Sequence, residues 1–464
     1  MTFNSVEYAV FLLAVLGGYW ALPRRGQNAL LLVAGYVFYG WWDARFLLLL
    51  ATSTLIDYSV ARPMSRSSGP KRRRWLALSV VANLGILATF KYWGFFTDSA
   101  STLARGLGLD WAPPVLEVVL PVGISFYTFQ SMSYAIDVFR RHIEPSRDLI
   151  EYATFVSFFP QLVAGPIERA GHLLPQFAAT RTRPDAEQVS SALALILVGL
   201  FRKVVIADAM APLVAEGFGS GASGGATLVA FYAFALQIYG DFAGYSAIAR
   251  GSARLLGIEL MVNFNAPYLA RNPTELWRRW HISLSTWLRD YLYVPLGGNR
   301  RGPGRQRLNL LVVMLVGGLW HGASWTFVAW GGIHGVLLVV HHWWRARHAG
   351  PETSRRGVLP VLATFHATCL AWVFFRASSF DEAGQVLSRL AESPLSGLRG
   401  ADLSLLALAA AATAALDAVV LRHGDEGAIA RWQPAERGVA MGVLALAILV
   451  YAGAEPVPFI YFQF

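Results

Sequence analysis

The chain has 464 residues, of which 55% are hydrophobic and only 15% are charged. Soluble domains typically carry about 25% charged residues, so this composition excludes a soluble globular protein and predicts a membrane protein with several spans. The net charge of +10 comes from short basic runs between apolar segments. Such runs are typical of cytoplasmic loops, and we therefore expect no nucleic-acid partner.

The cysteine content and the N-terminal segment narrow the class further. Cys369 is the only cysteine and lies in an apolar run, which excludes an intramolecular disulfide and a cysteine-based metal cluster. The first apolar run, 8–22, is preceded by a single charge, Glu7, and is followed by Pro23-Arg24-Arg25. This order does not fit a secretory signal. It predicts an N-terminus outside the cell and arginines in the cytoplasm.

Apolar segments of the first part of the chain are separated by short polar or basic stretches. We expect spans at about 6–22, 28–41, 45–60, 75–96 and 117–138. The basic run 61–74 is expected to form a cytoplasmic loop, the polar piece 97–114 to lie outside, and Arg140-Arg141-His142 to mark a cytoplasmic span end.

The next apolar segment, 154–171, contains Pro160 and Pro166. Proline removes a backbone donor and interrupts helices. Irregular backbone at membrane depth is tolerated only where protein or a water-filled cavity surrounds it. Two readings are therefore open: a re-entrant segment that lines a cavity, or a pair of kinked helices.

The second part of the chain shows a similar alternation. We expect spans at about 188–214, 226–250, 308–344 (two pieces hinged near His321 and Gly322), 357–376, 402–421 and 437–453, with a surface helix at 379–392. The arginine-rich segment 251–307 is expected at the cytoplasmic interface. The loop 217–225 contains a Gly-x-Ser-x-Gly match, but no strand precedes it, so we reject a serine hydrolase. The total is 11 to 12 spans in one domain, 1–464, with a core at 117–345.

His321 is the strongest candidate for chemistry. It lies inside an otherwise lipid-compatible run, between Gly318 and Gly322 and close to Trp320 and Trp325. An ionisable residue within a membrane segment is costly and marks a functional position by default. Tryptophan walls that exclude water would keep the imidazole neutral, and a neutral imidazole is a competent general base. The alternative is a core histidine that only binds a neighbouring helix.

His281 repeats the Trp-His pair in a basic setting. Trp280 precedes it, Arg278 and Arg279 stand just before, and Arg289 and Asp290 follow. On one helix, His281 would share a face with Trp277, Leu284 and Leu288. The arginines could bind phosphates of an acyl donor. A membrane-surface anchor of arginine and tryptophan is the alternative.

Other polar residues carry weaker signals. Asp241 and Lys203 are intramembrane charges that either pair with each other or line a cavity. His334 and His341 share a helical face, but no acid or cysteine completes a ligand set, so we expect no metal. The sequence has no Asp-x-Asp pair and no lysine in a glycine-rich phosphate loop, which argues against a metal-dependent sugar-nucleotide transferase and against ATP-driven transport.

Several blocks in order resemble the membrane-bound O-acyltransferase superfamily, in its bacterial alginate O-acetylation branch. They are LPVGISFYTFQSMSYAIDVFR (120–140), SFFPQLVAGPIER (157–169), QIYGDFAGYSAIARGSARLLGI (237–258), NFNAPYLARNPTELWRRWHISLSTWLRDYLYVPLGGNR (263–300), the Trp320-His321 block and PFIYFQF (458–464). One departure is Gly240, where the branch suggests a bulkier residue.

The resemblance implies an all-α polytopic fold, with tilted transmembrane helices ringed around a central funnel or tunnel and with re-entrant and interfacial helices. It implies that His321 is the family's nearly invariant histidine and that His281 is its second, more variable polar residue. We expect both to be catalytic. The expected substrate-binding residues are Trp280, Trp320, Arg278, Arg279, Asp290, Tyr291 and Asp241.

The resemblance also implies a reaction. An acetyl group would pass from a cytoplasmic thioester, acetyl-coenzyme A, towards an exported polysaccharide. No bound cofactor is expected. The partners would be the acyl donor, a periplasmic acyltransferase, the polysaccharide acceptor and the lipid bilayer, and the location would be the bacterial inner membrane. The alternatives are another cargo (D-alanine to teichoic acid or acetate to peptidoglycan) and an acetyl transporter without chemistry.

Overall fold

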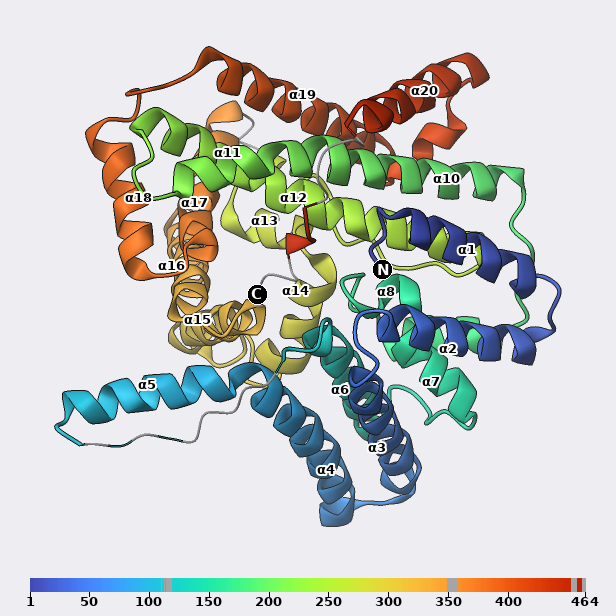
Figure 1. Ribbon diagram of the computed structural model, residues 1–464. Helices are drawn as coiled ribbons and strands as arrows, with labels where there is room; N and C mark the ends of the chain where they lie inside the picture. Colours follow the sequence, from blue (N-terminus) through green and yellow to red (C-terminus); the bar gives the residue numbers. More distant parts are fainter. Residues whose placement is uncertain (110, 112, 114–118, 349–356, 452–456, 461–464) are drawn as a thin grey trace. The chain divides into compact units, whose positions relative to one another are not determined.

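The computed structural model describes residues 1–109, 111, 113, 119–348, 357–451 and 457–460 (Figure 1). Within these residues the secondary structure is helical, without a strand, which confirms the all-α prediction. The chain forms two compact units. Unit 1 contains Met1–Arg183 with Leu256–Leu260, and unit 2 contains Pro184–Leu255 with Met261–Phe464. The single domain expected for 1–464 stays a prediction.

Six helical stretches in the described residues are long and apolar enough to cross a membrane, which confirms a polytopic membrane protein. They are Gly69–Gly106, Ala186–Phe218, Gly224–Leu255, Val358–Arg376, Gly400–His423 and Pro434–Tyr451. The expected 11 to 12 spans also counted shorter helices and helices with charged ends, and that total stays a prediction. The same holds for the ring of helices around a tunnel.

Unit 1 is built from helices that follow one another through short connections. They are α1 (Val6–Tyr19), α2 (Arg24–Gly40), α3 (Phe46–Arg66), α4 (Gly69–Leu87), η1 (Ala88–Tyr92), α5 (Trp93–Gly106), α6 (Ile124–Arg140), α7 (Leu149–Ser157), α8 (Phe159–Leu162) and α9 (Ala170–Ala178). Helices α3, α4 and α6 pack on one another (Figure 1).

One loop prediction and one predicted helix end in unit 1 were wrong. The basic run 61–74 is mostly helical, because α3 continues to Arg66 and α4 begins at Gly69. Pro70 lies in the first turn of α4, where proline is tolerated. The helix expected to end at about 96 continues to Gly106, since α4, η1 and α5 form one continuous stretch; that 97–114 lies outside stays a prediction. Residues 110, 112, 114 and 117–118 of these expected segments lie outside the described residues.

The proline-containing segment 154–171 has irregular, buried backbone. Helix α7 ends at Ser157, the short α8 follows, and 163–169 is non-helical while nearly every residue in it is buried within unit 1. Protein therefore surrounds the irregular backbone, as membrane depth requires. The path differs from a pair of kinked helices, and a re-entrant segment that lines a cavity stays a prediction.

Unit 2 holds the longer helices and all the histidines singled out above. Its elements are α10 (Ala186–Leu200), η2 (Phe201–Ala207), α11 (Asp208–Phe218), α12 (Gly224–Leu255), η3 (Pro267–Leu269), α13 (Pro273–Arg279), α14 (Ile282–Leu288), η4 (Arg289–Tyr293), α15 (Gly302–His321), α16 (Trp325–Arg347), α17 (Val358–Arg376), α18 (Phe380–Glu392), α19 (Gly400–His423), η6 (Glu426–Arg431) and α20 (Pro434–Tyr451).

Helix α12 is the centre of unit 2. It packs against α10, η2, α11, α17 and α19, and nearly all of its residues are buried. Gly199 of α10 and Gly244 of α12 face each other, and a Cβ on either would come 2.6 Å from the carbonyl oxygen of the other. Small residues at such a contact let two helices approach closely. The buried α12 thus supplies a rigid support for the site described next.

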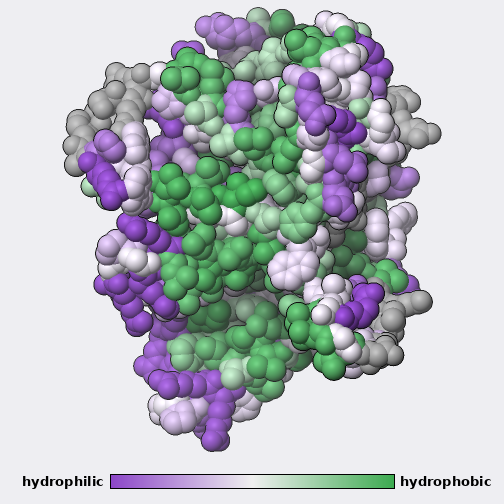
Figure 2. All heavy atoms as spheres, turned by 90° about the vertical axis from the view of Figure 1, so that its left-hand side faces the viewer, coloured by the Kyte–Doolittle hydropathy of each residue, from purple (hydrophilic) through white to green (hydrophobic). Residues whose placement is uncertain are grey.

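Apolar side chains also cover much of the outer surface. Figure 2 shows hydrophobic residues gathered over a broad part of one face, with hydrophilic residues towards its margins. Exposed large apolar side chains of unit 2 include Val336 and Val340 on α16 and Leu359 and Leu370 on α17. An exposed apolar surface of this kind fits contact with lipid rather than with water.

Candidate active site

The hairpin of α15 and α16 places His321. Helix α15 ends at His321, and α16 begins at Trp325 after a short turn, as the hinge near Gly322 predicted. A Cβ at Gly318 would clash with the carbonyl oxygen of Phe327, and a Cβ at Gly331 would clash with that of Met314. Glycine at these two positions therefore allows the close packing of the two helices that buries His321.

His281 lies in a sharp break between α13 and α14. Its φ of 41° is left-handed, a conformation that is uncommon outside glycine. Asn263 holds the break: its backbone carbonyl accepts from Ile282 N at 2.9 Å, and its Oδ1 accepts from Ser283 N at 3.2 Å and from Ser283 Oγ at 2.9 Å. The single helical face expected for Trp277, His281 and their neighbours was wrong, because the helix ends before His281.

The contact of His281 with Asn263 favours one tautomer of the imidazole ring. His281 Nδ1 lies 3.2 Å from Asn263 Oδ1. That atom must be an oxygen, because the backbone N–H of Ser283 can only donate to it. With the hydrogen on Nδ1, that nitrogen donates to Asn263 Oδ1 and Nε2 is the basic nitrogen; Ser283 Oγ also lies 3.3 Å from Nδ1. Burial lowers the pKa of His281 to about 3, so the ring is neutral near pH 7.

The two histidines are neighbours inside an aromatic cluster. The rings of His281 and His321 are 6.3 Å apart between centroids, and both side chains are buried. Trp320 lies 4.9 Å from His321 and 5.9 Å from His281. On its other sides, His321 contacts Trp330 at 5.0 Å and Phe375 at 5.4 Å. The fold thus brings together two imidazoles that are 40 residues apart in the sequence.

The aromatic cluster extends to a third buried histidine. His334 packs edge-on against Trp330 at 4.9 Å and against Trp277 at 5.1 Å. Neither ring nitrogen of His334 has a hydrogen-bond partner among the described residues, and buried polar groups are normally paired. Trp372 of α17 stacks on Trp330 at 5.5 Å. The described part of the site therefore combines basic nitrogens and indole donors in a buried, mostly apolar setting.

Comparison with known proteins identifies the family to which the chain belongs. A model of the membrane-bound O-acyltransferase family matches residues 42–380. The chain belongs to the membrane-bound O-acyltransferase family.

Two similar proteins are both named probable alginate O-acetylase AlgI. One, from Azotobacter vinelandii, is 40% identical over 88% of this chain and 82% of its own length. The other, from Pseudomonas putida, is 38% identical over the full length of both chains. A peptidoglycan O-acetyltransferase of Helicobacter pylori is 35% identical over 83% of this chain and 78% of its own length. The prediction that this chain is an O-acyltransferase is confirmed.

Only some of the predicted substrate-binding residues of this O-acyltransferase lie at the histidine pair. Trp320 contacts the rings of both histidines. Trp280 packs against Phe264 at 5.2 Å and against Trp372 at 5.1 Å. Trp325, expected to wall a tunnel, is instead 55% exposed, because it stands at the outer start of α16. The sequence pattern could not tell an inward tryptophan from an outward one.

The charged candidates lie in a more open setting. Arg279 binds Glu275 at 2.6 Å, Arg278 is exposed, and Asp290 binds Arg289 at 2.7 Å. Tyr291 packs on Trp287 at 5.0 Å. Substrate binding by Arg278, Arg279, Asp290 and Tyr291 stays a prediction.

Asp241 is engaged inside unit 2. Its carboxylate pairs with Lys203 at 3.0 Å and accepts a hydrogen bond from Ile460 N at 2.6 Å. Of the two readings open for these charges, the structure shows the ion pair, and substrate binding by Asp241 stays a prediction. Gly240, where the resemblance suggested a bulkier residue, lies close to η2. A Cβ at this position would come 2.9 Å from the carbonyl oxygen of Arg202, so this chain has no room for a larger side chain there without a shift.

Phe459 connects the end of the chain to the site. Its ring packs on Tyr245 at 4.4 Å and on Phe242 at 6.1 Å. Phe242 in turn meets His281 edge-on at 4.7 Å. Tyr461–Phe464, the rest of the family-like block 458–464, lies outside the described residues. Sequence reasoning did not foresee these contacts, because they join residues more than 210 positions apart.

Proposed function

We propose that this enzyme transfers an acetyl group from acetyl-coenzyme A on the cytoplasmic side of a bacterial inner membrane towards an exported polysaccharide, with His321 as the general base. The observation that carries the proposal is the buried pair of His281 and His321 at 6.3 Å. The names of the similar proteins support acetate as the cargo and a glycan as the acceptor.

The reaction requires the transfer of one proton and one acyl group. His321 takes the proton of an acceptor hydroxyl while the oxygen of that hydroxyl attacks the thioester carbonyl. The tetrahedral intermediate then expels the thiolate, which receives that proton from the imidazolium. The products are the ester and free coenzyme A. General base catalysis of this kind contributes about 10²- to 10⁴-fold to the rate, and aromatic surroundings favour the neutral imidazole that it needs.

His281 is proposed to position the reacting groups. Its Nδ1–H is committed to Asn263, so Nε2 is the atom that can accept a hydrogen bond from a donor or acceptor group. Holding two substrates in one orientation in a dry site can lower a barrier by several kcal/mol. Trp320, which contacts both rings, limits how far either imidazole can turn.

The first test is made in cells. A His321→Ala strain is compared with a His366→Ala strain, because His366 is an exposed histidine on α17. We expect the acetyl content of secreted polysaccharide to fall to background in the first strain and to stay normal in the second. Equal acetylation in both strains, with equal amounts of protein in the membrane, would contradict the proposal.

The cargo is tested with the purified full-length protein in lipid nanodiscs. Acetyl-coenzyme A labelled in the acetyl group is the first donor, and a D-alanyl carrier protein is the second. We expect thioester cleavage with acetyl-coenzyme A alone. Cleavage of the carrier thioester alone would assign the enzyme to the other cargo, and uptake of label into vesicles without cleavage would argue for transport.

A further inference from the structure

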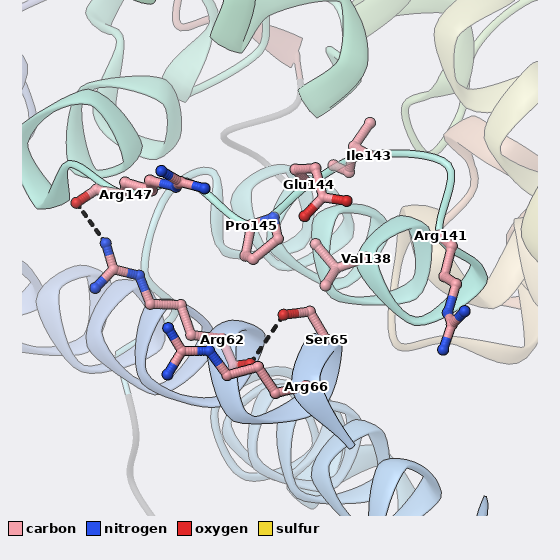
Figure 3. Close-up of a pocket in the computed structure, with 9 residues that line it drawn as sticks. All are labelled: Arg62, Ser65, Arg66, Val138, Arg141, Ile143, Glu144, Pro145 and Arg147. Carbon is pink, nitrogen blue, oxygen red and sulfur yellow. Dashed lines mark hydrogen bonds between the residues drawn. The ribbon is translucent and has the colours of Figure 1, made fainter. Parts of the chain in front are cut away.

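Unit 1 contains an arginine-lined cavity that the acyltransferase reaction does not use. Its volume is about 660 Å³. Four arginines line it: Arg62 and Arg66 from the end of α3, and Arg141 and Arg147 from the segment that follows α6 (Figure 3). Glu144 is the one acidic residue of the lining. The cavity therefore has a clear excess of positive charge.

The arginines of this cavity are not neutralised by the protein. Among the described residues, none of the four guanidinium groups forms an ion pair with a carboxylate, whereas Arg24 of the same unit pairs with Glu151. Four cations around one cavity repel each other unless an anion joins them. Arginine presents planar donors that match the oxygens of a phosphate group. The lining thus fits a phosphate-bearing ligand.

The backbone around the cavity is arranged to hold these arginines. Arg141 has a left-handed φ of 62°, an uncommon conformation for an arginine. It is held where α6 ends by hydrogen bonds from Arg141 N to Val138 O and from His142 N to Asp137 O. Arg62 then donates to the carbonyl of Arg147 at 2.6 Å, which fastens the returning segment to α3 (Figure 3).

Helix α3 carries an apolar stripe that leads to the cavity. Leu48 and Leu55 are 73% and 50% exposed, and with Arg62 they recur every seven residues, so they share one face of the helix. At 1.5 Å per residue, Leu55 lies about 10 Å and Leu48 about 21 Å from Arg62 along the axis. Half of a bilayer core is about 15 Å thick. Leu55 falls within that length and Leu48 lies beyond it, and apolar contacts followed by arginines match the chains and headgroup of one phospholipid.

We propose that this cavity binds the phosphate of an anionic phospholipid headgroup, with the acyl chains lying along Leu55 and Leu48 of α3. The basic runs at 61–74 and 140–142 place this end of α3 and α6 on the expected cytoplasmic side. The site belongs to unit 1 and includes no residue of the candidate active site. A soluble phosphate compound would use the same arginines but not the leucine stripe.

The test measures lipid binding to the purified full-length protein in neutral detergent. The rise in melting temperature is titrated with phosphatidylglycerol, phosphatidylcholine, glycerol phosphate and inorganic phosphate. The variant Arg66→Gln/Arg147→Gln removes two lining charges and breaks no side-chain hydrogen bond of the described residues. The control Arg73→Gln/Arg74→Gln removes the same charge from exposed positions of α4 outside the cavity.

We expect wild type and control to bind phosphatidylglycerol alike, and the cavity variant to bind it roughly 30-fold more weakly. If that variant melts early without lipid, the single variant Arg66→Gln is used, with an expected loss of about fivefold. Equal losses in variant and control would overturn the proposal, as would equal binding of phosphatidylcholine. Binding of glycerol phosphate or inorganic phosphate as tightly as the lipid would assign a soluble ligand instead.

Discussion

Replacement of Asn263 by alanine tests whether the break that presents His281 is built by this one side chain. Its Oδ1 accepts from Ser283 N and Ser283 Oγ and contacts His281 Nδ1, all in a buried setting. Each lost hydrogen bond costs about 0.5–1.5 kcal/mol net, and more where a donor remains buried without a partner. These three contacts and the hydrogen bond from Asn263 Nδ2 to Ser246 Oγ at 3.3 Å give a loss of about 2–5 kcal/mol in the free energy of unfolding.

The same change should also reduce activity. Without Asn263 Oδ1, the left-handed His281 and its ring tautomer are no longer held. A displacement of about 1 Å in a reacting group can cost about 100-fold in rate. We therefore expect the acetylation rate to fall about 100-fold while the affinity for the donor changes little. Asn263→Asp keeps an oxygen at the same place and should restore part of the rate.

The assays are thermal unfolding of the purified protein and acetyl transfer in cells. Asn265→Ala is the matched control, because it removes the same side chain two residues away and Asn265 Oδ1 has no hydrogen-bond partner among the described residues. If Asn263→Ala and Asn265→Ala agree within about 0.5 kcal/mol in stability and within about twofold in rate, the reasoning is refuted.

Three further predictions concern stability. The folded-state pKa of His281 is lowered, so the unfolded chain binds more protons below pH 6.5, and stability falls as the pH falls. We expect wild type to lose about 1.4 kcal/mol more than His281→Asn between pH 7.5 and 5.5, measured by thermal unfolding. Gly331→Ala should lower the free energy of unfolding by several kcal/mol, because the new Cβ would clash with the carbonyl oxygen of Met314. Gly332→Ala should leave it nearly unchanged in the same assay, because its Cβ would contact only a methyl group of Leu315 at 3.5 Å. Asp417→Asn should lower the free energy of unfolding by about 1–3 kcal/mol, because it removes one of the two carboxylates that pair with the buried Arg202 and leaves only Glu426. Asp402→Asn, whose partner Arg399 is exposed, should cost under about 1 kcal/mol; equal losses would contradict this account.

Most helices could be predicted from the sequence because each is a local apolar pattern. The pieces around His321 are an example: the apolar run and its glycines predicted two helices and a hinge, and the structure has both. One prediction of the helix path was wrong where a residue distant in the sequence determines the local backbone conformation. The break at His281 depends on Asn263, which lies 18 residues earlier and gives no pattern of its own.

The composition of the site was predictable only in part. His321, His281 and Trp320 stood out because two Trp-His pairs are rare in an apolar chain. Trp330, Trp372 and Phe375 did not, since an aromatic residue in an apolar run has the same pattern whether it faces lipid or a buried histidine. His334 was noticed only as half of a metal pair, although its spacing of four residues from Trp330 places both on one face of α16.

The most direct measurement of the central claim is the rate at which the purified full-length protein releases coenzyme A thiol from acetyl-coenzyme A in nanodiscs. His321→Ala is compared with wild type and with His366→Ala. The account predicts a loss of about 10²- to 10⁴-fold for His321→Ala and a normal rate for His366→Ala. A His321→Ala protein that is folded and releases thiol within twofold of the wild-type rate would contradict it.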